Sequence, residues 1–243
     1  MSSQSKKIAL VTGANQGIGL EIARQLGEQG ITVLIGARNN ARGEEAARGL
    51  NADGLLASAL YLDVTAQQSI ENAARWLSET YGRLDILVNN AAIAPSTWRP
   101  ASDVPLEEVR ALYETNVFGL LAVTQAMLPL LRRSSAGRIV NISSGMASLS
   151  RMSQVPPEIL QAFPVSLASS KTTVNALTLF LAKELERTGI KVNAVDPGPT
   201  ATARNPRGSR TPQQAARVAV HFATIADDGP TGGFFDENGS LPW

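Results

Sequence analysis

The stretch Thr12-Gly13-Ala14-Asn15-Gln16-Gly17-Ile18-Gly19 decides the fold of this chain. It follows an aliphatic run at residues 8–11 and leads into a segment where Ile18, Ile22 and Leu26 recur at helical spacing. Glycines let a backbone approach a phosphate closely, and a helix N-terminus offers unpaired N–H groups with a partial positive charge. The sequence therefore predicts a strand, a phosphate-binding loop and a helix. A tight turn that binds nothing is the alternative, and the flanking strand and helix argue against it.

Short aliphatic runs alternate with longer segments of helical periodicity along the chain. The expected strands are residues 8–11, 32–35, 59–62, 84–88, 138–142 and 191–195. Such runs are typical of parallel strands that are buried on both faces. Because crossovers between parallel strands are right-handed, helices cover both faces and a ligand crevice opens at the carboxyl ends of the strands. We expect an α/β fold: a single-domain Rossmann-type doubly wound parallel sheet of about seven strands, with helices on both faces.

Size and composition narrow the function classes. A chain of 243 residues that is 44% hydrophobic can bury one core, so residues 1–243 are expected to form a single domain. Lys and Arg number 22 against 21 Asp and Glu, which leaves no charge surplus to attract nucleic acid or an anionic membrane. With no cysteine and His221 as the single histidine, we expect no metal site, and a small molecule is the expected partner.

The expected location of the protein follows from the distribution of apolar runs. Residues 1–7 form a polar tail without an apolar targeting segment, and no later apolar run is expected to reach bilayer-spanning length. These features predict a cytoplasmic protein that does not enter a membrane.

The end of the second expected strand indicates which dinucleotide the loop binds. Sites for NAD usually place an acid there to hold the ribose 2′-hydroxyl, whereas this chain has Gly36-Ala37-Arg38, with Arg42 one helical turn later. A guanidinium group suits a 2′-phosphate. NADP(H) is therefore favoured over NAD(H). A solvated helix start is the alternative interpretation, and it fits Arg42 more readily than Arg38.

With these residues in place, the chain resembles the short-chain dehydrogenase/reductase family over residues 7–202. Asp63 and Val64 match the acid that contacts adenine in that family and its neighbour, and Asn89-Asn90-Ala91-Ala92 matches a family motif whose last residue is glycine. Pro197-Gly198, followed by Thr200 and Thr202, matches the loop on the nicotinamide side. Together these patterns imply NADP(H) contacts at Gly13, Asn15, Gln16, Gly17, Ile18, Gly19, Arg38, Arg42, Asp63, Val64, Asn90, Ala91, Lys171, Pro197, Gly198, Thr200 and Thr202.

The resemblance also implies the catalytic positions. Asn116 matches the asparagine that helps hold a proton-relay water, Ser144 matches the serine that orients the substrate, and Lys171 matches the lysine that binds the nicotinamide ribose. The family has a tyrosine four residues before this lysine, and here that position is Leu167. The tyrosine donates a proton to the carbonyl oxygen, and the lysine cation lowers its pKa. Leu167 has nothing to donate.

Two function classes therefore stay open. The segments 36–38 and 229–235 look most like the carbonyl-reductase-like branch, which implies an NADP(H)-dependent reductase or dehydrogenase that acts on a ketone or alcohol with an atypical proton donor. The alternative is a non-redox relative: a cyclase, isomerase, dehydratase or cofactor-binding protein. Candidate donors for the first class are a water ordered by Ser144 and Lys171, a hydroxyl of the substrate, or Tyr113, for which an aromatic packed on a helix face is the favoured alternative. An apolar Leu167 shapes a pocket for an apolar substrate in either class.

Two irregular segments are expected to border the substrate. Residues 148–164, with Met152, Val155, Ile159, Leu160 and Phe163, form an expected substrate loop, for which packing on its own core is an equal alternative. Residues 197–212 form an expected lid over the nicotinamide. Family members commonly assemble through the helices that correspond to residues 106–131 and 167–188, so we expect a homo-oligomer, a dimer or tetramer.

Overall fold

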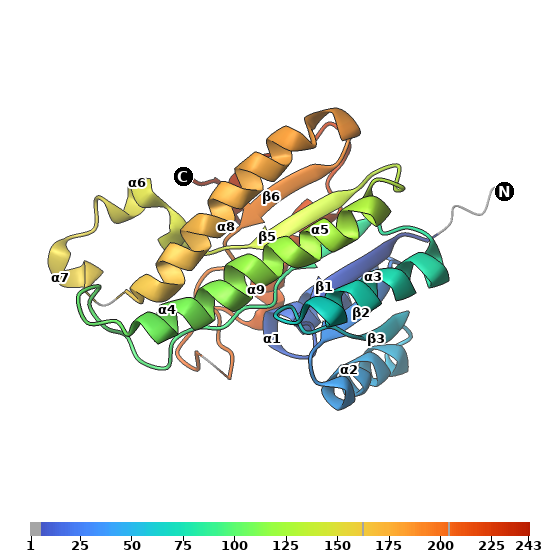
Figure 1. Cartoon of the computed structure of the whole chain (residues 1–243), viewed down its shortest axis with the longest axis horizontal. Coiled ribbons are helices and arrows are strands. Elements are labelled where there is room, and N and C mark those ends of the chain that lie inside the picture. Colours follow the sequence, from blue (N-terminus) through green and yellow to red (C-terminus); the bar gives the residue numbers. More distant parts are fainter. Residues whose placement is uncertain (1–5, 162, 204) are drawn as a thin grey trace.

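The computed structural model describes residues 6–161, 163–203 and 205–243, so most of the polar tail expected at residues 1–7 lies outside it. Strands and helices alternate from the first strand onward (Figure 1). The strands are β1 (Ile8–Thr12), β2 (Thr32–Ala37), β3 (Ala57–Tyr61), β4 (Ile86–Asn89), β5 (Arg138–Ile142), β6 (Lys191–Val195), β7 (Phe234–Asp236) and β8 (Gly239–Ser240). The α-helices are α1 (Gly17–Glu28), α2 (Asn40–Ala52), α3 (Gln67–Tyr81), α4 (Leu106–Tyr113), α5 (Leu120–Leu131), α6 (Leu149–Met152), α7 (Pro157–Leu160), α8 (Val165–Glu184) and α9 (Pro212–Ala223). The shorter elements are the π-helical turn η1 (Glu114–Gly119) and the 3₁₀ turns η2 (Gly145–Ala147) and η3 (Glu186–Thr188).

The strands form one sheet in the order β3-β2-β1-β4-β5-β6-β7-β8. All neighbours pair in parallel except β7 and β8, which form an antiparallel hairpin. The strand order reverses between β1 and β4, and ligands of doubly wound sheets bind at such a switch point. The Rossmann-type fold expected from the sequence is confirmed. The difference is the eighth strand: β8 is only two residues long, and no aliphatic run marks it.

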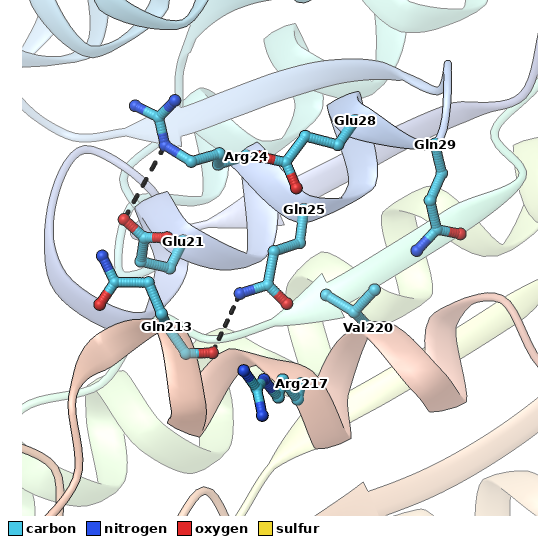
Figure 2. A pocket seen from close by; sticks show the side chains of 8 residues that line it. All are labelled: Glu21, Arg24, Gln25, Glu28, Gln29, Gln213, Arg217 and Val220. Atoms are coloured by element: carbon cyan, nitrogen blue, oxygen red, sulfur yellow. Dashed lines mark hydrogen bonds and ion pairs between the residues drawn. The ribbon is translucent and has the colours of Figure 1, made fainter.

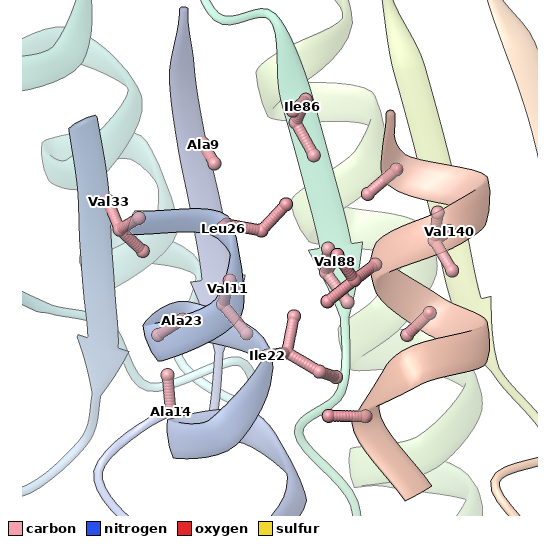
Figure 3. Packing of buried hydrophobic residues seen from close by; sticks show 14 of the residues in the cluster. Ala9, Val11, Ala14, Ile22, Ala23, Leu26, Val33, Ile86, Val88 and Val140 are labelled. Carbon is pink, nitrogen blue, oxygen red and sulfur yellow. The ribbon is translucent and has the colours of Figure 1, made fainter. Parts of the chain in front are cut away.

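Helices cover both faces of the sheet because side chains of each strand alternate between two cores. On β1, Ala9 and Val11 belong to the cluster beneath α1, α2 and α9, part of which Figure 3 shows. Ile8 and Leu10 belong to the cluster beneath α3, α5 and α8. Full burial of a large aliphatic side chain stabilises a fold by about 1.5–3 kcal/mol, so the two clusters fix the position of the β1–α1 loop.

The segment Leu106–Leu131 is one continuous helix of 26 residues made of α4, η1 and α5. By length and composition it is apolar enough to cross a membrane, which corrects the expectation that no run reaches that length. Half of its most apolar window is buried in the protein. There α5 packs against α3 and β4, and Val123 and Met127 are completely buried. This is the packing of a core helix.

Candidate functional site

The glycine loop joins β1 to the N-terminus of α1 at the carboxyl edge of the sheet. Gly13 and Gly17 adopt φ angles of 65° and 60°, which side-chain-bearing residues rarely adopt. Gln16 precedes α1 in an extended conformation, its side chain does not cap the helix, and the first turn contains no acidic residue. The backbone N–H groups at the start of α1 are therefore available to an anion such as a pyrophosphate.

The loop is too close to its neighbours to accept larger residues. A Cβ atom at Gly13 would lie 2.9 Å from the Cα atom of Ala91, and one at Gly19 would lie 2.4 Å from Nδ2 of Asn90. At Gly17 the nearest atom would be the methyl group of Thr202, at 3.7 Å. The loop thus packs tightly on the sheet side, while Gly17 faces an open cradle next to the expected lid. These features fit a dinucleotide phosphate group.

Thr12 and Asn90 hold the loop in place. The hydroxyl of Thr12 accepts hydrogen bonds from the backbone N–H groups of Asn90 and Ala91, at 3.0 and 2.9 Å. The amide of Asn90 donates to the carbonyl oxygens of Thr12 and Gly13, at 2.9 and 3.2 Å. The cofactor contact that the resemblance implies for Asn90 stays a prediction, and the structure adds that its side chain positions the glycine loop. Sequence reasoning misses Thr12 in this role.

The two arginines after β2 lie on the surface beside the loop. Arg38 and Arg42 are exposed, and neither side chain makes a hydrogen bond or ion pair with another described residue. Arg42 lines a depression of about 380 Å³ together with Asn15 and Gln16. Asn15, Gln16 and Arg42 therefore come together next to the start of α1, where a phosphate on the adenosine ribose is expected.

Asp63 and Val64 lie at the carboxyl edge just after β3. One carboxylate oxygen of Asp63 accepts from the backbone and hydroxyl of Thr65, at 3.0 and 2.7 Å. The backbone oxygen of Val64 lies only 2.7 Å from where a Cβ of Gly119 would be, so this turn packs against η1. The turn that the sequence assigns to the adenine is thus held rigidly next to the long helix.

The π-helical turn η1 positions Asn116. Its side-chain oxygen accepts from the backbone N–H of Ile93 at 2.8 Å, and its Nδ2 atom donates to the Ile93 carbonyl at 3.0 Å and to the hydroxyl of Ser170 at 3.1 Å. π-helical turns inside α-helices occur frequently at functional sites. The amide thus ties the β4–α4 connection to α8. The sequence signals neither the π-turn nor the two partners.

Lys171 projects from α8 toward the end of β5. Its side chain is 5% exposed, and its Nζ atom donates to the backbone oxygen of Ile142 at 2.6 Å. Burial lowers the pKa of Lys171 from its ordinary value of 10.5 to about 8. Ser144 follows β5 directly, is partly exposed, and accepts from the backbone N–H of Met146 at 3.3 Å. The structure therefore brings Lys171 and Ser144 to the same end of β5, as the sequence predicts.

Leu167 lies one turn before Lys171 on α8, so both side chains share a face of the helix. Leu167 is partly exposed. The neighbouring hydroxyls are bound elsewhere: Ser166 donates to Glu108 at 2.6 Å, and Ser170 donates to the Leu167 carbonyl at 2.8 Å. The Tyr113 hydroxyl lies 3.3 Å from that of Thr173. Position 173 is six residues from Leu167 and faces a different side of α8, so Tyr113 is not next to Leu167.

The segment expected to form a lid comes close to the glycine loop at Thr202, whose methyl group lies 3.7 Å from where a Cβ atom of Gly17 would be. Gly198 has a φ of 73°, and its N–H donates to the carboxylate of Asp196 at 2.9 Å. Thr200 is buried and donates to the carbonyl of Gly198 at 2.9 Å. Arg210 donates to the carbonyl of Pro197 at 3.2 Å and forms an ion pair with Glu237, in the turn between β7 and β8. These contacts fix the base of the loop that the resemblance assigns to the nicotinamide side.

A depression of about 440 Å³ lies apart from these residues, between α1 and α9 (Figure 2). Within it, Gln25 donates to the backbone oxygen of Gln213 at 3.0 Å. Its lining residues are Glu21, Arg24, Gln25, Glu28, Gln29, Gln213, Arg217 and Val220. The sequence predicts a cofactor or substrate contact for none of them, so this depression is not part of the candidate site.

Comparisons with known proteins identify the family of this chain. The family model described as short chain dehydrogenase matches residues 7–212. Carbonyl reductase (NADPH) 1 from Mus musculus is 33% identical, over 99% of this chain and 100% of its own. Salutaridine reductase from Papaver bracteatum is 32% identical, over 95% of this chain and 94% of its own. The structure of a gluconate 5-dehydrogenase from Burkholderia cenocepacia in complex with NADP and tartrate is 26% identical, with a TM-score of 0.83, over 95% of this chain and 92% of that one.

The family match covers the glycine loop, the asparagine of the π-turn and the lysine of α8. Relatives that are at least 30% identical align over nearly the whole chain. This chain belongs to the short-chain dehydrogenase family of oxidoreductases.

Proposed function

We propose that this chain is an NADP(H)-dependent carbonyl reductase, or the reverse alcohol dehydrogenase, in which residues 1–243 serve a single cofactor site. One observation supports the proposal: Asn116 bonds to Ser170, the neighbour of Lys171, and Lys171 bonds to Ile142, two residues before Ser144, at the sheet edge that carries the glycine loop. A relative named for NADPH and a related structure that holds NADP support the cofactor assignment.

The bound cofactor supplies hydride to the carbonyl carbon or accepts it from the alcohol. The residues of this chain do the rest. The α1 N-terminus binds the pyrophosphate, and Arg38 and Arg42 bind the 2′-phosphate. Ser144 orients the substrate oxygen, while Asn116 keeps α8 and the β4–α4 connection in register. The buried Lys171 holds positive charge where the oxygen becomes negative.

The expected substrate is small and apolar. Leu149, Ile159 and Leu160 of the loop at residues 148–164 are exposed, as is Trp98. Met152, Val155 and Phe163 are partly buried within the same loop. The expected substrate loop contains the short helices α6 and α7 and is not wholly irregular, and exposed apolar side chains on such a surface segment are typical of a surface that covers a ligand.

A direct assay tests the reductase. We expect the native chain to oxidise NADPH in step with alcohol formation from at least one ketone of an aliphatic, aromatic and polycyclic panel. The Leu167→Tyr variant restores a phenol and is expected to react faster, by roughly 10²-fold, because a positioned general acid contributes roughly 10²–10⁴-fold. Absorbance of NADPH together with product chromatography measures both.

Leu167 itself favours a second candidate function, a non-redox enzyme or cofactor-binding protein. In that case the native chain binds NADPH and produces no alcohol from any ketone, and only Leu167→Tyr turns over. Cyclisation, isomerisation and dehydration would then be assayed with the native chain, in which Ser144 and Lys171 still polarise an oxygen.

We also propose that the chain forms a homo-oligomer through the face made by α4, η1 and α8. Leu106, Phe118 and Phe180 are exposed there, Phe180 by 72%. Light scattering coupled to size exclusion should give a dimer or tetramer for the native chain, and Phe180→Glu should shift it to monomers because a charge at the contact loses its water. Leu56→Glu, at an exposed apolar residue before β3, is the control. A native monomer would contradict this proposal.

A further inference from the structure

The missing phenol leaves the proposed reductase without its usual acid, and the described hydroxyls near Leu167 do not replace it. Tyr113 is bound to Thr173, and Ser166 is bound to Glu108. Ser144 faces the reacting end of β5, but a serine hydroxyl is a far weaker acid than an ammonium group. A donor for the carbonyl oxygen therefore has to come from another group at the same end of β5.

Lys171 provides a cation at this end of β5. Its Nζ atom is an ammonium with three N–H donors, of which one is directed to the Ile142 carbonyl at 2.6 Å. No ion pair holds Lys171 within the described part of the chain, so no carboxylate competes for the other two donors. A leucine has no hydroxyl, so Leu167 makes no hydrogen bond to the Nζ atom of Lys171, one helical turn later on α8.

We propose that Lys171 donates the proton to the carbonyl oxygen directly in this chain. The proposal rests on the reductase function proposed above. In the step, an Nζ–H bond breaks and an O–H bond forms while the carbonyl carbon accepts a hydride from the reduced nicotinamide. The carbonyl compound is reduced to the alcohol, the nicotinamide is oxidised, and the neutral amine regains its proton from solvent water.

The protonation behaviour of Lys171 suits this role. Burial lowers its pKa to about 8, close to a working pH at which a general acid is most effective.

Charged residues on the elements around α8 are engaged elsewhere: Glu108 of α4 accepts from Ser166, and Asp196 after β6 accepts from Gly198. Arg151 of α6 and Glu114 of η1 are exposed, as are Glu186 and Arg187 of η3. Lys191 begins β6, at the end of the strand opposite to the site.

The test compares Lys171→Arg in two backgrounds. Arginine keeps the positive charge near the cofactor but does not release a proton at working pH. In the native background we expect Lys171→Arg to lower kcat for ketone reduction by roughly 10²-fold or more. The Kd for NADPH, from fluorescence titration in both backgrounds, separates any loss of cofactor binding from the loss of proton transfer. In the Leu167→Tyr background the phenol donates the proton instead, so Lys171→Arg should lower kcat by less than about tenfold.

Equal losses in both backgrounds would overturn the proposal and leave Lys171 as a positioning residue. A native chain that is inactive while Leu167→Tyr reduces ketones would overturn the reductase function itself, and the two failures are thus distinguishable.

A second readout, the titration of Lys171 itself, needs no turnover. The chain has five lysines, so the ¹³Cε resonance that Lys171→Arg removes can be assigned directly. We expect it to titrate with a midpoint near 8, and a midpoint above about 10 would contradict an acid role.

Discussion

The free energy of unfolding of the native chain is expected to rise by about 3 kcal/mol between pH 8 and pH 10.5, relative to that of a Lys171→Met variant. Burial lowers the pKa of Lys171 from 10.5 to about 8 in the folded chain, so between these values the unfolded state binds more protons than the folded state. Stability therefore increases with pH in this window, and it is constant below and above it. The difference between 10.5 and about 8, at about 1.4 kcal/mol for each tenfold change in proton affinity, corresponds to about 3 kcal/mol.

Urea denaturation of both proteins at several pH values from 7 to 10.5 measures this effect. Subtracting the variant removes the contribution of every other titrating group. Lys183→Met is the matched control, because Lys183 lies on the same helix, is 70% exposed and forms a surface ion pair with Glu186. The free energy of unfolding of Lys183→Met should change with pH in parallel with that of the native chain. A constant difference for Lys171→Met across the range would mean that the lysine titrates like an exposed one.

Much of the fold follows from local patterns in the sequence. Each of the six aliphatic runs overlaps a strand. Their β-branched residues, such as the buried Val33 and Ile35, favour the extended conformation. The glycine loop is equally local, because its φ angles require glycine at particular positions. The hairpin of β7 and β8 has no such signal, since strands of three and two residues are too short to show a period.

The sequence indicates which residues belong to the candidate site but not which contacts they make. Asn116, Ser144 and Lys171 can be named from motifs, but no local pattern signals that Asn116 pairs with Ile93, 23 residues away. The ion pair of Arg210 with Glu237 joins segments that no pattern connects. Asn90 illustrates the same limit, because its motif does not signal that its amide bonds to the loop backbone.

The second large effect is expected from a substitution at Arg38, which should change the preference for NADPH over NADH. Arg38→Asp should weaken NADPH binding by roughly 10²-fold or more and leave NADH binding nearly unchanged. Arg38 is exposed and makes no hydrogen bond or ion pair with other described residues, so its charge is available to a 2′-phosphate. A hydrogen bond to a charged group contributes about 1.5–3 kcal/mol, and each 1.4 kcal/mol corresponds to a tenfold change in Kd. The aspartate adds repulsion of the phosphate and offers an acceptor to a free 2′-hydroxyl.

Fluorescence titration of both cofactors, with three variants, separates the contributions. Arg42→Asp reports on the second arginine, which lines the depression beside Asn15 and Gln16 and should give a smaller NADPH-selective loss. Arg48→Asp makes the same charge change on α2 at a residue that pairs with Glu44 on the surface, so it should leave both affinities unchanged. If Arg38→Asp weakened NADPH and NADH equally, the arginine would stabilise the loop and not the phosphate, and the assignment of NADP(H) would lose its main support in the sequence. A selective loss places the 2′-phosphate at Arg38, because no other difference between the cofactors exists for the residue to sense.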